Sequence, residues 1–334
     1  MLNEAVIVCI AKNEERYINE WIYYHLKIGF SKIIIYDNSD NNSLFYLNHS
    51  WHGKVIVYNF PGKGKTIQLN RPEKVIITGG QTNAYDDYII NWRKRKLLYK
   101  WVAFLDCDEF IQLFNGEDIL HFFHRVDFHE GVLNLNWLYY GSNGHDKYTN
   151  EPILQRFTKR QTLEANILHK TICVITDVKY FMYPGHIPYT DKFYRDSENK
   201  RIKRGFYTDP SCTKDIALAH FFVKSKEEWQ SKMDRGNKHT DIKTERTWDT
   251  FNMHDINQVE DLSLLHILKS SRQKNTLNVE KNEDANILNF DYDSYLWNNP
   301  DLFQANIISP EALIQHYNTF GKIEIKYKLR NKLK

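Results

Sequence analysis

The sequence predicts an α/β protein built around a wound mixed sheet, and three observations support this fold class. In the first third of the chain, short apolar runs rich in Val and Ile alternate with longer stretches of helical periodicity. The 334 residues suffice for one large domain and a smaller appendage. The chain contains 21 Tyr, 19 Phe and 8 Trp but only 14 Gly and 8 Pro, a composition typical of packed elements and not of disorder.

The first elements are predicted in the order strand, helix, strand. Residues 5–10 (AVIVCI) form an apolar run typical of a buried strand. Apolar side chains then recur at helical spacing over residues 14–28, with Asn13 placed to cap the helix. Residues 32–36 (KIIIY) predict a second strand, which delivers Asp37 to its carboxyl end.

The later elements divide the chain into three parts. We expect a catalytic domain over residues 1–236, a helical extension with a linker over 237–284, and a small helical module over 285–334. Within the first part, the patterns predict strands at 55–60, 101–105, 131–137, 170–176 and 216–222, helices at 81–100, 116–125 and 226–235, an irregular segment at 61–80 and a loop at 140–150.

Composition excludes some classes of function. The net charge of +3 is too small for a nucleic-acid footprint, and no zinc-finger spacing or RNA-binding motif is present. The four cysteines are scattered, which favours a reducing compartment, and the absence of a signal-peptide pattern or an 18-residue apolar span favours the cytoplasm. Residues 322–334 carry six basic side chains against Glu324, which suits peripheral contact with an anionic membrane but equally a solvated tail.

The strongest chemical signal is Asp106-Cys107-Asp108, directly after the predicted strand at 101–105. With Glu109, three carboxylates occupy four positions at a strand end. In open α/β sheets, ligands bind at this edge. Like charges packed together are destabilising unless a cation neutralises them. Oxygen ligands suit Mg²⁺ or Mn²⁺, which can bridge a diphosphate, so we expect a metal site at Asp106 and Asp108.

Further candidates lie at the same edge. His220 ends a predicted strand (IALAH), and with Lys224 it would supply a third metal ligand and a cation for a β-phosphate, although a strand-end histidine is more often structural. Asp37 could accept hydrogen bonds from a uracil N–H or a ribose hydroxyl, but its surroundings are also typical of an ordinary turn. Asn13 is predicted with these residues to bind the donor.

The predicted loop at 140–150 is a candidate for binding the acceptor. Trp137 precedes it and offers an aromatic face to a sugar, while Asn143 and His145 offer polar groups to its hydroxyls. Asp146 is the candidate general base for an acceptor hydroxyl. The bland alternative is that this Gly-rich segment is only a turn.

Several sequence blocks stand in a characteristic order: AKNEE at 11–15, YDN at 36–38, WVAFLDCDEFI at 101–111, LNWLYYGSNGH at 135–145, and His220 with Lys224. Over residues 5–236 they resemble glycosyltransferase family 92 and its bacterial family 2-like relatives. The resemblance implies a GT-A fold, a UDP-sugar donor with galactose as the first candidate, a divalent metal and an inverting single displacement. It assigns the metal to Asp106 and Asp108 and supports His220. Two departures are Phe221, where the family usually has Tyr, and the missing membrane anchor of animal members.

Residues 290–328 are similar to a short helical module appended to bacterial polysaccharide glycosyltransferases. In this chain the module would bind acceptor glycan, a partner or the membrane.

The leading hypothesis is therefore sugar transfer to a glycan or glycolipid acceptor, such as a lipopolysaccharide or capsule precursor. Two alternatives stay open. A sugar nucleotidyltransferase would normally carry a Gly-rich phosphate loop at the place of Ala11-Lys12-Asn13-Glu14. A non-catalytic carbohydrate-binding protein could keep the same fold.

Overall fold

The computed structural model of the chain describes residues 2–39, 41–51, 53–60, 80–95, 99–163, 166–182, 185–205, 207, 212–235 and 246–270, with residues 295, 302, 305, 307 and 310–321. Nearly all of the segment predicted as irregular at 61–80, much of the predicted module at 285–334 and the basic tail at 322–334 lie outside these residues. Among the helices of the described part, none is both long and apolar enough to cross a membrane.

The first half of the chain supplies most of the parallel sheet. Its elements are β1 (Leu2–Ala11), α1 (Ile18–Lys27), β2 (Lys32–Asp37), α2 (Leu47–Ser50), β3 (Val55–Asn59), α3 (Gly80–Arg95), β4 (Tyr99–Phe104), β5 (Glu109–Leu113), α4 (Ile119–Arg125) and β6 (Val132–Tyr139).

The second half adds further strands and the helices around the sheet's carboxyl edge. Its elements are α5 (Ile153–Arg156), β7 (Lys159–Arg160), β8 (His169–Val174), η1 (Ile175–Asp177), β9 (Val178–Met182), β10 (Ile187–Thr190), β11 (Tyr194–Arg195), β12 (Arg201–Ile202), β13 (Ile216–His220), α6 (Lys226–Arg235), α7 (Trp248–His254), β14 (Val259–Glu260), α8 (Ser263–Ser270), α11 (Pro310–His316) and the π-helical turn η3 (Tyr317–Gly321).

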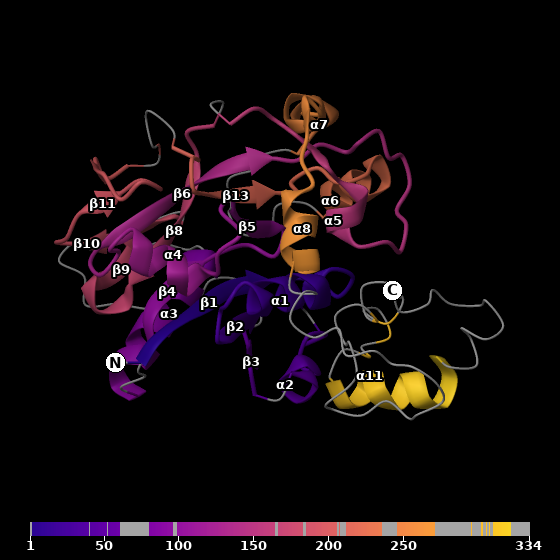
Figure 1. Ribbon diagram of the computed structural model, residues 1–334, viewed down its shortest axis with the longest axis horizontal. Coiled ribbons are helices and arrows are strands. Elements are labelled where there is room, and N and C mark those ends of the chain that lie inside the picture. The colour runs from indigo at the N-terminus through magenta and orange to yellow at the C-terminus, as the bar shows by residue number, and fades with distance from the viewer. Residues whose placement is uncertain are drawn as a thin grey trace.

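The sheet confirms the predicted α/β class. Ten strands join along the order β12-β11-β6-β8-β4-β1-β2-β3, with β13 and β5 attached through β6. The strands β4, β1, β2 and β3 are parallel, β8 runs antiparallel between β4 and β6, and β13 is parallel to β6. Therefore β1, β2, β4, β6 and β13 all point the same way, and their carboxyl ends share one edge. The arrowheads of β6 and β13 point toward α5, α6 and α8 (Figure 1).

Two buried clusters lie on the two faces of this sheet. Along β1, Ala5, Ile7 and Cys9 belong to one cluster while Val6 and Val8 belong to the other. This alternation follows from the two-residue period of a strand. The first cluster contains the apolar side chains of α1 and α4, and the second contains those of α3. The continuous apolar runs of the sequence are thus explained by burial on both faces.

Three predicted helix boundaries were wrong, among them that of α4, which begins at Ile119 and not at 116. The first helix begins at Ile18 and not at 14, and its N-cap position is Tyr17 and not Asn13. Asn13 has a left-handed backbone with φ of 56°, which asparagine tolerates, and it opens a turn before the helix. The predicted helix at 81–100 ends at Arg95, and Tyr99 already pairs with Leu2 in the sheet. Strand pairing there overrides the helical pattern of the sequence.

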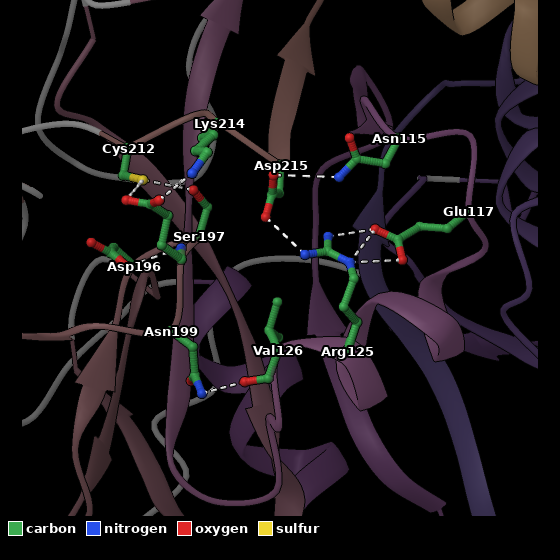
Figure 2. Close-up of polar contacts among 11 residues, drawn as sticks. Asn115, Glu117, Arg125, Val126, Asp196, Ser197, Asn199, Cys212, Lys214 and Asp215 are labelled. Carbon is green, nitrogen blue, oxygen red and sulfur yellow. Dashed lines mark hydrogen bonds and ion pairs between the residues drawn. The ribbon is translucent and has the colours of Figure 1, made fainter.

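A polar network braces the start of β13. Arg125, at the end of α4, contacts Glu117 and reaches Asp215, which immediately precedes β13 (Figure 2). The guanidinium Nη1 lies 3.0 Å from Asp215 Oδ2, and Asn115 donates to the other carboxylate oxygen at 3.3 Å. The pairs are partly exposed, so each stabilises only modestly. They do tie β13 to α4 and so help to set the position of the histidine that ends this strand.

Candidate active site

The predicted site residues collect at the shared carboxyl edge of the sheet. Asp106 follows β4, Trp137 lies near the end of β6, and His220 ends β13. In the antiparallel pairing of β13 with β5, His220 stands opposite Glu109. Beyond this pair, Phe221 N–H donates to the carbonyl oxygen of Asp108 at 2.9 Å. The strand register therefore brings His220 to Asp108 across more than a hundred residues of sequence.

Asp108 lies between a histidine and a lysine. Its Oδ1 is 3.5 Å from Nε2 of His220, and its Oδ2 is 3.0 Å from Nζ of Lys232 on α6. Lys232 also donates to the carbonyl oxygen of Phe222 at 2.8 Å, which fixes its ammonium group. Burial alone would raise the pKa of Asp108, but Lys232, His220 and Lys224 outweigh it and hold this pKa well below its usual range. Asp108 is thus an ionised carboxylate held in a defined orientation.

Asp106 has different partners. Its Oδ2 lies 2.8 Å from Nζ of Lys170 on β8, and its Oδ1 accepts a hydrogen bond from Gln81 Nε2 at 2.5 Å. Burial lowers the pKa of Lys170, but Asp106 and Glu109 more than compensate and raise it. Although burial raises the pKa of Asp106, Lys170 brings it below its usual value. This buried ion pair is therefore present at neutral pH.

Glu109 shapes the turn that carries both aspartates. Its Oε2 accepts a hydrogen bond from the backbone N–H of Asp106 at 2.8 Å, and its side chain is fully buried. Burial raises the pKa of Glu109 well above its usual range. Glu109 therefore serves the geometry of the turn that carries Asp106 and Asp108.

His220 belongs to an aromatic group. Its ring lies 4.6 Å from the ring of Trp137 and 5.4 Å from that of Tyr139, almost parallel to the latter at 26°. Burial lowers the pKa of His220, although Asp108 acts in the opposite direction. The imidazole is therefore neutral at pH 7, the form in which histidine binds metal ions.

A cleft of about 450 Å³ opens between the start of α1 and the segment that follows β13. Its charged lining consists of Glu14, Arg16, Lys224, Glu228 and Lys232. Because Lys232 contacts Asp108 as well, the cleft lies directly beside the Asp108–His220 pair. Lys224 has a left-handed backbone with φ of 56°, and its ammonium lies 4.2 Å from the centre of the Tyr17 ring.

The charges of this cleft do not balance. Glu228 is already neutralised, since Arg156 lies 2.9 Å away and Tyr17 donates its hydroxyl hydrogen to the same carboxylate. Although burial acts to raise it, Arg156, with smaller contributions from Lys224 and Ser225, lowers the pKa of Glu228 to about 2. Lys232 is compensated in the same way by Asp108, so the cations of Arg16 and Lys224 share the cleft with Glu14. Such an excess of positive charge suits a di- or polyanionic ligand such as a diphosphate.

The other two predicted donor residues have separate surroundings. Asn13 lines the cleft, and its backbone N–H donates to Ser39 Oγ at 3.0 Å. Asp37 is fully buried, and its two carboxylate oxygens accept hydrogen bonds from the backbone N–H groups of Ser39 at 2.9 Å and Leu44 at 3.0 Å. Asp37 thus shapes the loop after β2, and its contact with a nucleotide stays a prediction.

The predicted acceptor loop packs against α6 and the segment around Thr158. Asn143 donates to Thr158 Oγ1 at 3.0 Å, and a ring nitrogen of His145 lies 3.1 Å from the carbonyl oxygen of Arg156. Asp146 is largely exposed and pairs with Lys226 at 2.8 Å. Of the four predicted acceptor and base residues, Trp137 is the one whose ring contacts His220 within the described part of the chain. The acceptor and base roles of Asn143, His145 and Asp146 stay predictions.

Sequence reasoning missed Lys170, Gln81 and Lys232 as site residues. A signal for Lys170 exists, because it stands in an apolar strand (HKTICV), and a lysine buried in a strand requires a carboxylate partner. Gln81 and Lys232 lie on helices whose patterns do not reveal which face meets the site. Their positions depend on how α3 and α6 dock on the sheet.

The distances around Asp106, Asp108 and His220 show whether a divalent metal ion fits between these side chains. Within the described ranges, no group of three or more His, Cys, Asp or Glu side chains is arranged to hold a metal ion. Asp106 is engaged by Lys170 and Gln81, whereas Asp108 Oδ1 and His220 Nε2 face each other at 3.5 Å. Neighbouring ligands of one Mg²⁺ at ~2.1 Å lie roughly 3 Å apart. Asp108 and His220 therefore fit a cation that takes its other ligands from a diphosphate and water.

A known protein family matches most of the chain. The model of glycosyltransferase family 92 matches residues 4–257, which include β1 from its third residue, every later element as far as α7, and all of the site residues just described. No curated protein gives a significant match to the chain.

Proposed function

Because the chain belongs to glycosyltransferase family 92, we propose that it is a metal-dependent, inverting enzyme of GT-A type that uses a UDP-sugar donor. The transferred sugar is a hexose, with galactose as the first candidate. The acceptor is a hydroxyl of a glycan or glycolipid, such as a lipopolysaccharide or capsule precursor. The observation that carries this proposal is the cationic cleft beside Asp108 and His220.

The cleft supports a diphosphate leaving group. Lys224 and Lys232 line it together with Arg16, so negative charge that develops on the departing diphosphate would meet fixed cations in a partly buried site. Asn13 would contact the donor from the β1 side of the same cleft, and Asp37 would approach the nucleoside.

Mn²⁺ or Mg²⁺ would be held by Asp108 and His220, with Asp106 as the further ligand that the family resemblance implies. When bound, the cation supplies Lewis-acid stabilisation of the diphosphate. The protein's own residues prepare this site, because Lys232 orients Asp108 and burial keeps His220 neutral.

In the proposed displacement, the acceptor oxygen forms a bond to C1 of the sugar while the bond between C1 and the β-phosphate oxygen breaks. UDP leaves with that electron pair, and the acceptor's proton passes to a carboxylate base. Asp146 remains the proposed base. It is exposed and paired with Lys226, so it would have to exchange this partner for the acceptor hydroxyl. Asn143 and His145 would hold the acceptor near it.

A panel of UDP-sugars, each incubated with Mn²⁺ or with EDTA, tests the proposal. We expect metal-dependent release of UDP from at least one sugar. Asp108→Asn should lower the rate at least roughly 100-fold, since it removes stabilisation needed in the transition state. The matched control is Asp191→Asn, which alters an exposed carboxylate paired with Lys179 and should keep full activity.

The outcome separates the three readings of the sequence. Release of pyrophosphate from UTP and a sugar phosphate would identify a nucleotidyltransferase. Binding without turnover would identify a carbohydrate-binding protein.

The proposal also places the enzyme at the inner face of the membrane, held there by the basic side chains of residues 322–334. Sedimentation with anionic vesicles tests this location separately.

A further inference from the structure

The turn at Asp106–Asp108 separates two chemically different surroundings. On the Asp108 side, Lys232 is paired with Asp108, and Lys224 and Arg16 leave the cleft with an excess of positive charge. On the Asp106 side, the buried cation Lys170 is already compensated by Asp106 itself. A diphosphate needs the first environment, whereas a neutral, hydroxyl-rich ligand needs hydrogen-bonding groups without excess charge.

The Asp106 carboxylate is fixed before any ligand binds. Lys170 holds one oxygen at 2.8 Å and Gln81 holds the other at 2.5 Å. The Asp106 side chain nevertheless keeps 33 % of its surface exposed, while Lys170 keeps 1 %. Each carboxylate oxygen has more than one lone pair, so Asp106 can accept further hydrogen bonds from a ligand on its exposed side.

A second histidine completes this side of the turn. His186 lies directly before β10, half-buried, and interacts electrostatically with both Asp106 and Lys170. Burial, followed by the charge of Lys170, lowers the pKa of His186 to about 3. The ring is therefore neutral and offers one donor and one acceptor, the combination that a sugar hydroxyl matches.

Trp137 connects the two histidines. Its ring lies 4.6 Å from His220 and 5.9 Å from His186. The indole N–H is buried, and no hydrogen-bond partner for it exists among the described residues. The same holds for Nδ1 of His220. A buried N–H without a partner is destabilising, so a site that contains one is suited to a ligand that supplies an oxygen.

We propose that Asp106, Lys170, His186 and Trp137 form the subsite that binds the hydroxyls of the transferred sugar and selects among sugars. The Trp137 N–H and the His186 ring contact hydroxyls, while Lys170 acts as a positioning residue through Asp106. This inference rests on the proposed function. It divides the donor site into a cationic half for the diphosphate and a charge-balanced, ring-lined half for the hexose.

The test compares two ligands that differ only in the sugar. Isothermal titration with UDP and with UDP-galactose, both with Mn²⁺ and without acceptor, measures the two affinities for each variant. Trp137→Phe keeps an aromatic ring and removes only the N–H. We expect it to leave the Kd of UDP within about twofold and to weaken UDP-galactose about fivefold, the effect of one neutral hydrogen bond. His186→Gln should do the same and provides a second, independent variant.

Two controls frame these measurements. Trp248→Phe alters an exposed tryptophan on α7, 41 % accessible, and should change neither affinity. Lys224→Met, on the diphosphate side, should weaken UDP and UDP-galactose by the same factor. Thermal unfolding of each variant checks that the fold is kept.

The outcomes distinguish this inference from the proposed function. Equal weakening of UDP and UDP-galactose by Trp137→Phe and His186→Gln, or no effect on either ligand, would overturn the sugar subsite alone. A raised acceptor KM with unchanged UDP-galactose affinity would move Trp137 to the acceptor site. Failure of the wild-type protein to bind any UDP-sugar would overturn the proposed function, and the subsite with it.

Discussion

His25 shows how a single buried side chain couples the fold to pH. The ring is fully buried between α1 and β5, and its Nδ1–H donates to the carbonyl oxygen of Trp21 at 2.8 Å. Its Nε2 accepts from the backbone N–H of Ile111 at 3.3 Å. Both contacts require the neutral ring with its proton on Nδ1. Burial lowers the pKa of His25 to about 3, although the bond to Trp21 acts against this.

We predict that His25 makes the protein less stable in mild acid. Below pH 6.5 the unfolded chain takes up a proton on this ring, whereas the folded chain does so only near pH 3, so the free energy of unfolding falls between these values. At pH 5 the loss from His25 is roughly 2 kcal/mol. Urea unfolding of wild type and His25→Gln at pH 7 and pH 5 measures it. The variant should be less stable at pH 7 but lose less on acidification; identical losses would contradict the prediction.

At the scale of elements, Glu228 docks α6 onto the rest of the site. Its carboxylate takes hydrogen bonds from Arg156, from Tyr17 on the approach to α1, and from Ser225. The side chains of Arg156 and Glu228 are 2 % and 6 % exposed, so water screens this pair very little. Because α6 also carries Lys232, the same pair helps to place the cation that orients Asp108.

Replacing Glu228 with Gln should therefore affect both stability and binding. The change leaves the Arg156 guanidinium buried without its counter-charge, which costs about 3–5 kcal/mol. UDP affinity should fall as well, since α6 loses its anchor. Glu227→Gln is the matched control, because Glu227 is exposed and the amide oxygen of a glutamine there can still accept from Tyr148 N–H. Chemical denaturation and UDP titration of both variants measure the effects, and equal stabilities would show that the pair is not what holds α6.

The Arg156–Glu228 ion pair also makes the free energy of unfolding depend on pH. Here the cause is a carboxylate that must stay ionised, whereas for His25 it is a ring that must stay neutral. The pKa of Glu228 lies at about 2 in the folded chain, below its value of 4.5 when unfolded. Its stabilising effect is fully present above pH 4.5 and is lost as the pH falls toward 2. Wild type should therefore approach the Glu228→Gln variant in stability as the pH falls through this window. A stability difference that stays constant from pH 6 to pH 3 would argue against this assignment.

At the scale of the whole molecule, the sheet was predictable because its signals are local. The run at residues 5–10 is apolar at every position, and the structure buries its two faces in two different clusters. Asp106, Asp108 and His220 were predictable together because strand ends in a wound sheet share one edge. The pairing of Lys170 with Asp106 was not predictable, since it depends on the antiparallel pairing of β8 with β4. The left-handed backbone of Asn13 likewise reflects the turn that the docked helix requires.

The C-terminal residues test how far the molecule behaves as one unit. Tyr295, Leu302 and Leu313 are buried in the same cluster of side chains as Trp21 of α1 and Leu264 of α8. A shared core favours a single cooperative unfolding transition, even though the sequence predicts a separate module over residues 285–334.

We therefore predict that Leu313→Ala lowers the stability of the entire chain by about 2–5 kcal/mol, the usual cost of a cavity in a core. Gln315→Ala, an exposed change on the same helix, should stay within about 0.5 kcal/mol of wild type. UDP binding should be unchanged in both variants, because the proposed donor residues all lie before residue 236. Calorimetry distinguishes the outcomes. One transition that shifts as a whole supports the shared core, whereas a separate early transition in Leu313→Ala would instead make residues 285–334 an independent domain.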